Sequence, residues 1–224
     1  MIAPLLSVTA LSRAFGGVLA VDQVSFDLEP GKVNSIIGPN GAGKTTLLNL
    51  LTGVYAPSAG NVVFEGADVT GLAPHRLAAR GMARTFQNLQ IFFNMSALEN
   101  VMVGRHLRER AGWFAALLRS RRLTAGERES RDEAAALMRF VGLGEYLGAE
   151  ADAMPYGALK RLEIARALGG KPKLLLLDEP AAGLNPTETQ AINALITRLA
   201  QSGVTVVLVE HNMRLVMGVS DHIV

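Results

Sequence analysis

The chain has 224 residues, which suits one large domain or a core that carries a smaller subdomain. Hydrophobic residues make up 49% of it, so it is expected to fold around a sizeable core. A net charge of only +2 argues against a dedicated nucleic-acid-binding protein, and the lack of cysteine excludes disulfides and thiolate chemistry. No run approaches the roughly 18 to 20 apolar residues that a membrane-spanning helix needs.

Strand patterns dominate the first part of the chain. We expect strands at residues 5–8, 21–28, 32–37 and 61–64, the first two joined by a turn at Gly16-Gly17. The N-terminus is apolar but has no basic leader or cleavage site, so it is interpreted as a strand and not as a signal peptide.

From about residue 88 the character changes to helical, most clearly at residues 132–141. Strand patterns return at 174–177 and 204–209, where short uniformly apolar runs are typical of parallel strands buried on both faces. Asn185 is a good N-cap for a helix between these strands, and Gly203 is expected to end it.

A glycine-rich motif follows the strand at 32–37 and opens a helix, the context that identifies a phosphate-binding P-loop. Small residues let the backbone N–H groups surround phosphate oxygens, and the helix N-terminus adds a positive dipole end. Lys44 is predicted to contact the β- and γ-phosphates, and the Thr45 hydroxyl to ligate Mg²⁺. The predicted nucleotide-binding residues here are Gly38, Pro39, Asn40, Gly41, Ala42, Gly43, Lys44, Thr45 and Thr46.

Two acidic residues follow the apolar run at 174–177. Asp178 is expected to hold Mg²⁺, through water, and Glu179 to polarise the attacking water as general base. An acidic strand end is a weak signal alone, but its order after the P-loop makes it specific. We therefore predict an α/β fold: a mostly parallel, RecA-like P-loop NTPase core with an N-terminal antiparallel β portion and an inserted α-helical subdomain. The core would be residues 1–87 and 166–224, and the subdomain residues 88–165.

Further motifs, in order along the whole chain, resemble the ABC ATPase family. Taken singly each has an ordinary explanation as a core, cap or surface residue; together they imply family roles. Phe15 would stack on adenine, Gln87 would sense Mg²⁺ and the attacking water, and His211 would contact the γ-phosphate as a catalytic residue with Lys44 and Glu179. Tyr156, Gly157 and Ala158 would form the signature that docks on a nucleotide held by the opposite subunit.

The strings Arg84-Thr85-Phe86-Gln87-Asn88 and Asp178-Glu179-Pro180-Ala181-Ala182 look most like ATP-binding subunits of branched-chain amino acid transporters. That resemblance implies ATP and Mg²⁺ as cofactors, two integral-membrane permease subunits and a second ATP-binding subunit, identical or different. An external solute-binding protein would act indirectly, with no nucleic-acid partner. The chain would lie at the cytoplasmic face of the membrane. Rival functions are lipid or lipopolysaccharide export, a non-transport ABC ATPase on DNA or ribosomes, and a nucleotide sensor.

The chain departs from the family pattern at Pro155, where a serine hydroxyl normally donates to the γ-phosphate of the opposite site. Gly157 and Ala158 are expected to offer N–H groups in its place, so the two ATP sites of a dimer would be unequal. A strand is expected to start at residues 222–224, and family members normally continue for some tens of residues, so we expect a longer natural chain. The arginine-rich stretch at 105–122 predicts a solvated helical face, with a membrane-surface contact as the alternative.

Overall fold

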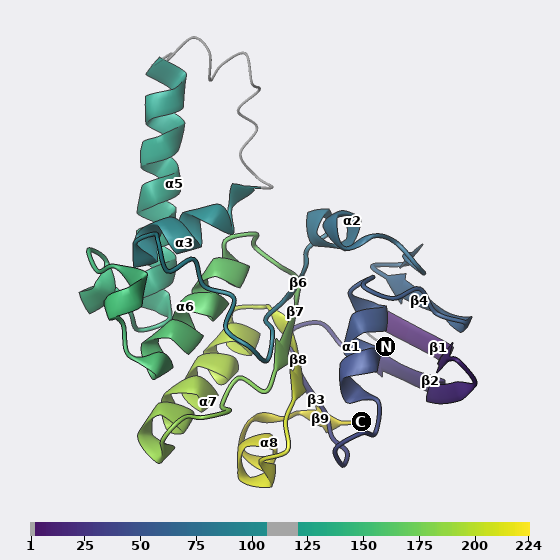
Figure 1. Cartoon of the computed structure of the whole chain (residues 1–224). Helices are drawn as coiled ribbons and strands as arrows, with labels where there is room; N and C mark the ends of the chain where they lie inside the picture. The colour runs from purple at the N-terminus through teal and green to yellow at the C-terminus, as the bar shows by residue number, and fades with distance from the viewer. Residues whose placement is uncertain (1–2, 107–120) are drawn as a thin grey trace. The chain divides into compact units, whose positions relative to one another are not determined.

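The computed structural model describes residues 3–106 and 121–224, which form two compact units (Figure 1). The first unit combines Met1–Gln87 with Pro172–Val224, and the second is Asn88–Lys171. The expected boundary at residue 165 falls inside helix α6 (Tyr156–Leu168), and the second unit instead runs on to Lys171 because the helix ends only at Gly169. Among the described residues, no helix combines the length and the apolar character needed to span a membrane.

A parallel sheet forms the centre of the first unit. Its strand order is β6-β7-β8-β3-β9. The strands are β6 (Met82–Arg84), β7 (Leu174–Asp178), β8 (Thr205–Val209), β3 (Val33–Ile36) and β9 (His222–Ile223). Every residue of β7, β8 and β3 is buried, so the prediction of parallel strands buried on both faces is confirmed. The strand expected at 222–224 is also present as β9.

An antiparallel sheet in the order β2-β1-β4-β5 completes the unit. Its strands are β1 (Leu6–Phe15), β2 (Val18–Leu28), β4 (Ala59–Phe64) and β5 (Ala67–Asp68). β1 extends beyond the expected residues 5–8. Its register shifts between Val8 and Leu11, and Ala10 has a φ of 46°. Such bulges break the alternation of buried and exposed residues by which a strand is recognised in a sequence.

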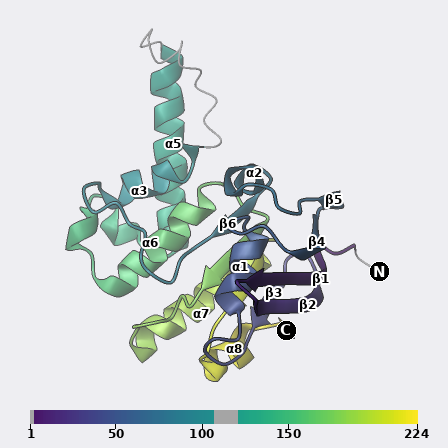
Figure 2. The same ribbon diagram turned by 45° about the vertical axis from the view of Figure 1, so that its right-hand side comes forward.

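Helix α1 (Lys44–Leu51) lies between the two sheets of this unit (Figures 1 and 2). Its leucines belong to one apolar core with residues of both sheets, among them Leu6 of β1 and Val207 of β8. Leu48 is 0% and Leu51 1% exposed, and each such leucine contributes roughly 1.5–3 kcal/mol of burial free energy. The short helix α2 (Pro74–Ala79) adds Leu77 to the same core.

Helix α7 (Pro186–Gln201) joins β7 to β8 and has the ends that its sequence predicts. Asn185 accepts from the Glu188 N–H at 2.9 Å, and the Glu188 carboxylate accepts from the Asn185 N–H at 3.0 Å. At the other end Gly203 has a φ of 92°, and its N–H donates to the carbonyl of Ala200. The capping box and the glycine stop are both confirmed.

The second unit is helical, as expected, with α3 (Ala97–Val103), α5 (Arg121–Phe140) and α6. Two short 3₁₀ turns, Gly144–Tyr146 and Ala151–Ala153, connect α5 to α6. Asn100 is 0% exposed in this unit, and its side chain bonds both the N–H and the carbonyl of Phe92 at 2.9 Å. One buried amide thereby fixes the loop that precedes α3.

The expected solvated face of the arginine-rich stretch is wrong for Arg105. This side chain is buried, donates to Ser130 Oγ at 3.0 Å and pairs with Glu133 on helix α5. Lys171 reaches the other carboxylate oxygen of Glu133 at 3.3 Å. The Arg105 guanidinium, with Lys171 assisting, holds the pKa of Glu133 below its usual value of 4.5. The side chains of residues 107–125, which include the other arginines of the stretch from Arg108 to Arg122, lie outside what the structure describes.

A buried carboxylate, Glu210, links two loops of the first unit. It is 2% exposed and accepts the N–H of Ala181 at 3.1 Å. Glu210 directly follows β8, whereas Ala181 lies in the loop after β7. The loop that leads from β7 to α7 is thereby tied to the end of the neighbouring strand.

Glu133→Gln is expected to destabilise the chain at neutral pH and to lose that effect in acid. A carboxylate with a lowered folded-state pKa contributes stability above its unfolded pKa, and this stability is lost as the pH falls through the folded value. Urea unfolding at about pH 7 and about pH 3 measures the difference. Glu129→Gln, on the exposed face of the same helix, is the control. If the difference in unfolding free energy between wild type and Glu133→Gln is the same at both pH values, the lowered pKa of Glu133 does not contribute to stability.

Glu210→Ala is expected to cost about 1–3 kcal/mol of unfolding free energy, because it removes the acceptor of the Ala181 N–H. Glu210→Gln keeps an oxygen at the same place and is expected to lose less. Urea titrations of the two variants test this. Equal losses would mean that the hydrogen bond to Ala181 does not carry the effect.

Candidate active site

The loop between β3 and α1, residues 38–43, is called here the glycine loop. Gly41 and Gly43 have φ values of 82° and 86°, a conformation that glycine adopts without strain. A Cβ atom at Gly43 would lie 2.2 Å from the carbonyl oxygen of Ala20, so no other residue fits there. This close approach directs the chain into α1, whose first N–H groups and dipole end favour an anion.

A cavity of about 940 Å³ opens beside the glycine loop, entirely within the first unit. Most predicted loop residues line it: Gly38, Pro39, Asn40, Gly41, Gly43, Lys44, Thr45 and Thr46. Ala42 is not among the lining residues. The remaining lining residues are Ala20, Ile37, Gln87, Glu179, Val209, Glu210, His211 and Met213. The topology of the parallel sheet thus brings three separate segments to the glycine loop, as ligands in open α/β sheets require.

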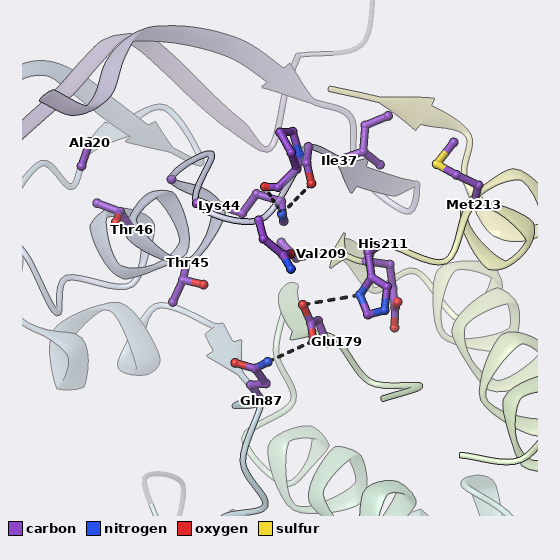
Figure 3. A pocket seen from close by; sticks show the side chains of 16 residues that line it. Ala20, Ile37, Lys44, Thr45, Thr46, Gln87, Glu179, Val209, His211 and Met213 are labelled. Atoms are coloured by element: carbon purple, nitrogen blue, oxygen red, sulfur yellow. Dashed lines mark hydrogen bonds and ion pairs between the residues drawn. The ribbon is translucent and has the colours of Figure 1, made fainter. Parts of the chain in front are cut away.

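Lys44 lies against the glycine loop, and its Nζ donates to the carbonyls of Gly38 at 2.6 Å and Pro39 at 2.9 Å (Figure 3). These are neutral acceptors, and a phosphate oxygen would be a stronger partner for the ammonium group. Figure 3 has the Thr45 hydroxyl on the side of the loop that faces Gln87 and Glu179. The first turn of α1 therefore presents a cation and a hydroxyl at the cavity.

Glu179 lies between Gln87 and His211 (Figure 3). Gln87 Nε2 donates to Glu179 Oε2 at 3.0 Å, and His211 Nδ1 is 3.6 Å from Glu179 Oε1. The carboxylate is therefore hydrogen-bonded by Gln87 and has the His211 ring beside its other oxygen while it lines the cavity. A carboxylate in this setting can accept a proton from a water molecule at the cavity wall.

The backbone at Glu179 is in the left-handed region, with a φ of 46°. Such a conformation costs a residue with a side chain about 1–3 kcal/mol and persists only where its surroundings hold it. Here the Glu179 N–H donates to the carbonyl of Val209 at 2.9 Å. This bond ties the residue after β7 to the end of β8.

Asp178, the last residue of β7, does not line the cavity. Its side chain is 5% exposed, and Oδ2 lies 2.8 Å from Nη2 of Arg84. Sequence reasoning missed this partner, and it also missed Glu210. An acidic residue directly after the buried strand β8 is the same signal that identified Asp178 and Glu179, so Glu210 could have been found.

Phe15 ends β1 and is 37% exposed; it is not a lining residue of the cavity. The Arg13 guanidinium lies 4.6 Å over the Phe15 ring, and Tyr55 meets the ring edge-on with centroids 5.2 Å apart. Phe15 is thus held in a small aromatic cluster at the surface of the first unit. Tyr55 is a second aromatic ring that the sequence did not single out.

The signature residues open helix α6 in the second unit, where Pro155 is the N-cap without a side-chain cap bond. Tyr156 is 45% exposed, whereas Gly157 and Ala158 are buried. The Ala158 N–H, expected to be offered to a phosphate, donates to the Pro155 carbonyl at 2.9 Å. The contact of Gly157 and Ala158 with a phosphate of the opposite site stays a prediction.

Comparisons with known proteins agree with this arrangement. The family model described as ABC transporter matches residues 21–182. The chain is 46% identical to the high-affinity branched-chain amino acid transport ATP-binding protein BraF of Pseudomonas aeruginosa, over 99% of this chain and 87% of BraF. It is 43% identical to LivG of Escherichia coli, a protein of the same description, over 98% and 87% of the two chains.

A solved structure gives the same result for the fold. An ATP-binding cassette of an ABC transporter in its ADP conformation superposes with a TM-score of 0.84 at 31% identity, over 99% of this chain and 86% of that one. The predicted α/β fold with a P-loop core is therefore confirmed. Together with the family match, these likenesses establish that the chain belongs to the ABC transporter family as one of its ATP-binding, ATP-hydrolysing subunits.

Proposed function

We propose that this chain hydrolyses Mg²⁺-ATP to power the import of amino acids, branched-chain ones in the first place, through separate membrane subunits. The observation that carries the catalytic part is the Gln87–Glu179–His211 arrangement facing the glycine loop. The transported class rests on the likeness to BraF and LivG.

The triphosphate would lie along the glycine loop, with its β- and γ-phosphates at the N-terminus of α1. Lys44 would exchange the carbonyls of Gly38 and Pro39 for phosphate oxygens, since a charged acceptor binds an ammonium more strongly than a neutral one. Adenine would stack on Phe15. The aromatic cluster with Arg13 and Tyr55 supports this role because it keeps the ring in one orientation.

Mg²⁺ fits the oxygen donors present. Thr45 and Gln87 line the cavity with a hydroxyl and an amide oxygen, and Asp178 is the neighbouring carboxylate. Within the described residues, no cluster of three or more histidine or acidic side chains could hold a metal by itself. Mg²⁺ commonly uses few protein ligands and completes its shell with water and substrate phosphates, and it would supply charge neutralisation at the phosphates.

Glu179 would accept the proton of the attacking water. Gln87 Nε2 donates to one carboxylate oxygen and His211 Nδ1 lies 3.6 Å from the other, so both side chains would be near the attacking water and the γ-phosphate. Stabilisation of charge on the transferred phosphoryl group would come from Lys44 and His211. These assignments give Lys44, Gln87, Glu179 and His211, which all line the cavity, a role in the reaction.

Two ATP-binding chains would close head-to-tail, each nucleotide lying between one glycine loop and the other chain's Tyr156, Gly157 and Ala158. Pro155 offers no hydroxyl, and the Ala158 N–H donates to the Pro155 carbonyl within the first turn of α6. Both observations support the hypothesis that the site built from this chain's signature binds phosphate more weakly. The partner would then be a different ATP-binding subunit, whose signature serves this chain's glycine loop.

Membrane permease subunits would dock on the second unit, beside Phe92 and Phe93. These rings are 43% and 49% exposed, although large apolar side chains are usually covered. Asn100 fixes the backbone of Phe92, and the Arg166 guanidinium lies 5.5 Å over its ring. An exposed but immobilised aromatic surface suits a lasting protein partner. In that arrangement the chain would lie at the cytoplasmic face of the membrane, and an external solute-binding protein would act through the permeases.

Glu179→Gln is expected to bind ATP about as well as wild type and to hydrolyse it at least ~100-fold more slowly, because the amide cannot accept the proton. Nucleotide binding and phosphate release, measured on the purified chain with its partners, separate the two effects. Lys44→Ala is the matched control and is expected to lose binding itself. Undiminished turnover in Glu179→Gln would remove Glu179 from the base role.

Co-purification tests the transport assignment. Glu179→Gln is expressed in the natural cell, trapped with ATP, solubilised gently and analysed for bound proteins; Glu179→Gln with Lys44→Ala is the untrapped control. Amino-acid permease subunits with a second, different ATP-binding chain are the expected result. Lipid-export subunits, or ribosomes without membrane proteins, would overturn amino-acid import and leave the ATPase chemistry intact.

A further inference from the structure

Arg84 is a buried arginine that connects the elements carrying two of the proposed Mg²⁺ ligands, Asp178 at the end of β7 and Thr45 on α1. It ends strand β6, and its side chain is 6% exposed. Nη2 donates to Asp178 Oδ2 at 2.8 Å, so the contact engages a single oxygen of that carboxylate. Asp178 is itself 5% exposed, so the ion pair is almost completely buried.

The other end of the same guanidinium reaches helix α1. Nη1 donates to Asn49 Oδ1 at 2.6 Å and lies 3.4 Å from Thr52 Oγ1. Asn49 stands one helical turn after Thr45, on the helix that begins at the glycine loop. Arg84 thus bridges the acidic end of β7 and the helix that carries the proposed Mg²⁺ hydroxyl.

A guanidinium suits this task because it is planar and presents its donors in a fixed fork. When one Nη is fixed on Asn49 and the other on Asp178, the carboxylate cannot rotate freely relative to α1. The Phe86 ring, 5.1 Å below the guanidinium carbon, packs against its face. Buried ion pairs add little net stability compared with apolar packing, so stability alone is a weak reason for such an arrangement.

We propose that Arg84 is a positioning residue. It fixes the Asp178 carboxylate relative to the Thr45 hydroxyl, so that both groups can contribute to binding one Mg²⁺ ion that is bound with ATP. The inference rests on the proposed Mg²⁺-ATP site and adds a residue that acts through Asp178 and not through contact with nucleotide. Arg84 does not line the cavity. Its effect should therefore appear in the response of nucleotide binding to Mg²⁺ and not in binding without the metal.

The test measures the affinity of the full chain for a fluorescent ATP analogue in Mg²⁺ and in EDTA, with no turnover involved. In Arg84→Gln, the gain in affinity caused by Mg²⁺ is expected to shrink about tenfold, in the range seen when the partner of a metal-binding side chain is removed. Affinity in EDTA is expected to stay near that of wild type. Arg84→Lys, which keeps the charge but not the fork, is expected to lose less.

Lys173→Gln is the matched control, because it removes one positive charge from an exposed ion pair with Glu65 in the same unit. It is expected to leave the Mg²⁺ response unchanged. A double-mutant cycle with Asp178→Asn adds a second criterion. If Arg84 acts through Asp178, the double variant loses no more of the Mg²⁺ response than Asp178→Asn alone.

Thermal melts identify variants that fail to fold. If Arg84→Gln unfolds, Asn49→Ala takes its place, since it keeps the ion pair but removes the shorter of the two hydrogen bonds from Nη1; it is expected to weaken the Mg²⁺ response as well. An unchanged Mg²⁺ response in a folded variant, or additive losses in the cycle, would overturn the inference. A wild-type chain that binds no nucleotide would instead refute the proposed site.

Discussion

The burial of helix α1 between two sheets is the interaction on which the rest of the first unit depends. The helix spans only Lys44–Leu51, and a helix of this length is unstable in water by itself. Its leucines hold it within the core that both sheets share. Since the glycine loop ends where α1 begins, this burial also fixes the direction of the first N–H groups and of Lys44. The apolar packing of α1 therefore sets the geometry of the glycine loop and of Lys44.

The parallel sheet supplies the second constraint, because its strands end at the same edge. Pairing of Asp178 with Val209 in the ladder aligns the residues that follow β7 with those that follow β8. Glu179, Glu210 and His211 therefore meet although they are far apart in the sequence. Two cross-links, Glu179 N–H to the Val209 carbonyl and Ala181 N–H to Glu210, join these loops. A shift of either loop would move the carboxylate and the histidine together.

The sequence predicted what depends on local pattern. The glycine loop, the buried strands β7 and β8 and the Asn185 cap each have a signal within a few residues. It did not predict β6, a strand of three residues, or the full length of β1, whose bulges interrupt its alternation. It could not predict the partner of Asp178 either. Arg84 lies 94 residues away in the chain, and their contact exists only because β6 pairs with β7.

Asp178 and Glu179 are adjacent in the sequence, but their carboxylates have different partners because β7 ends between them. Asp178 is the last residue of β7, which is buried on both faces, and its side chain contacts Arg84. At Glu179 the backbone leaves the strand with a φ of 46°, and the carboxylate reaches the cavity between Gln87 and His211. The conformational strain and the buried ion pair lie on neighbouring residues. Each residue is held by a contact to a different strand, the Glu179 N–H by β8 and the Asp178 carboxylate by β6, so the order of the strands gives the two carboxylates different partners.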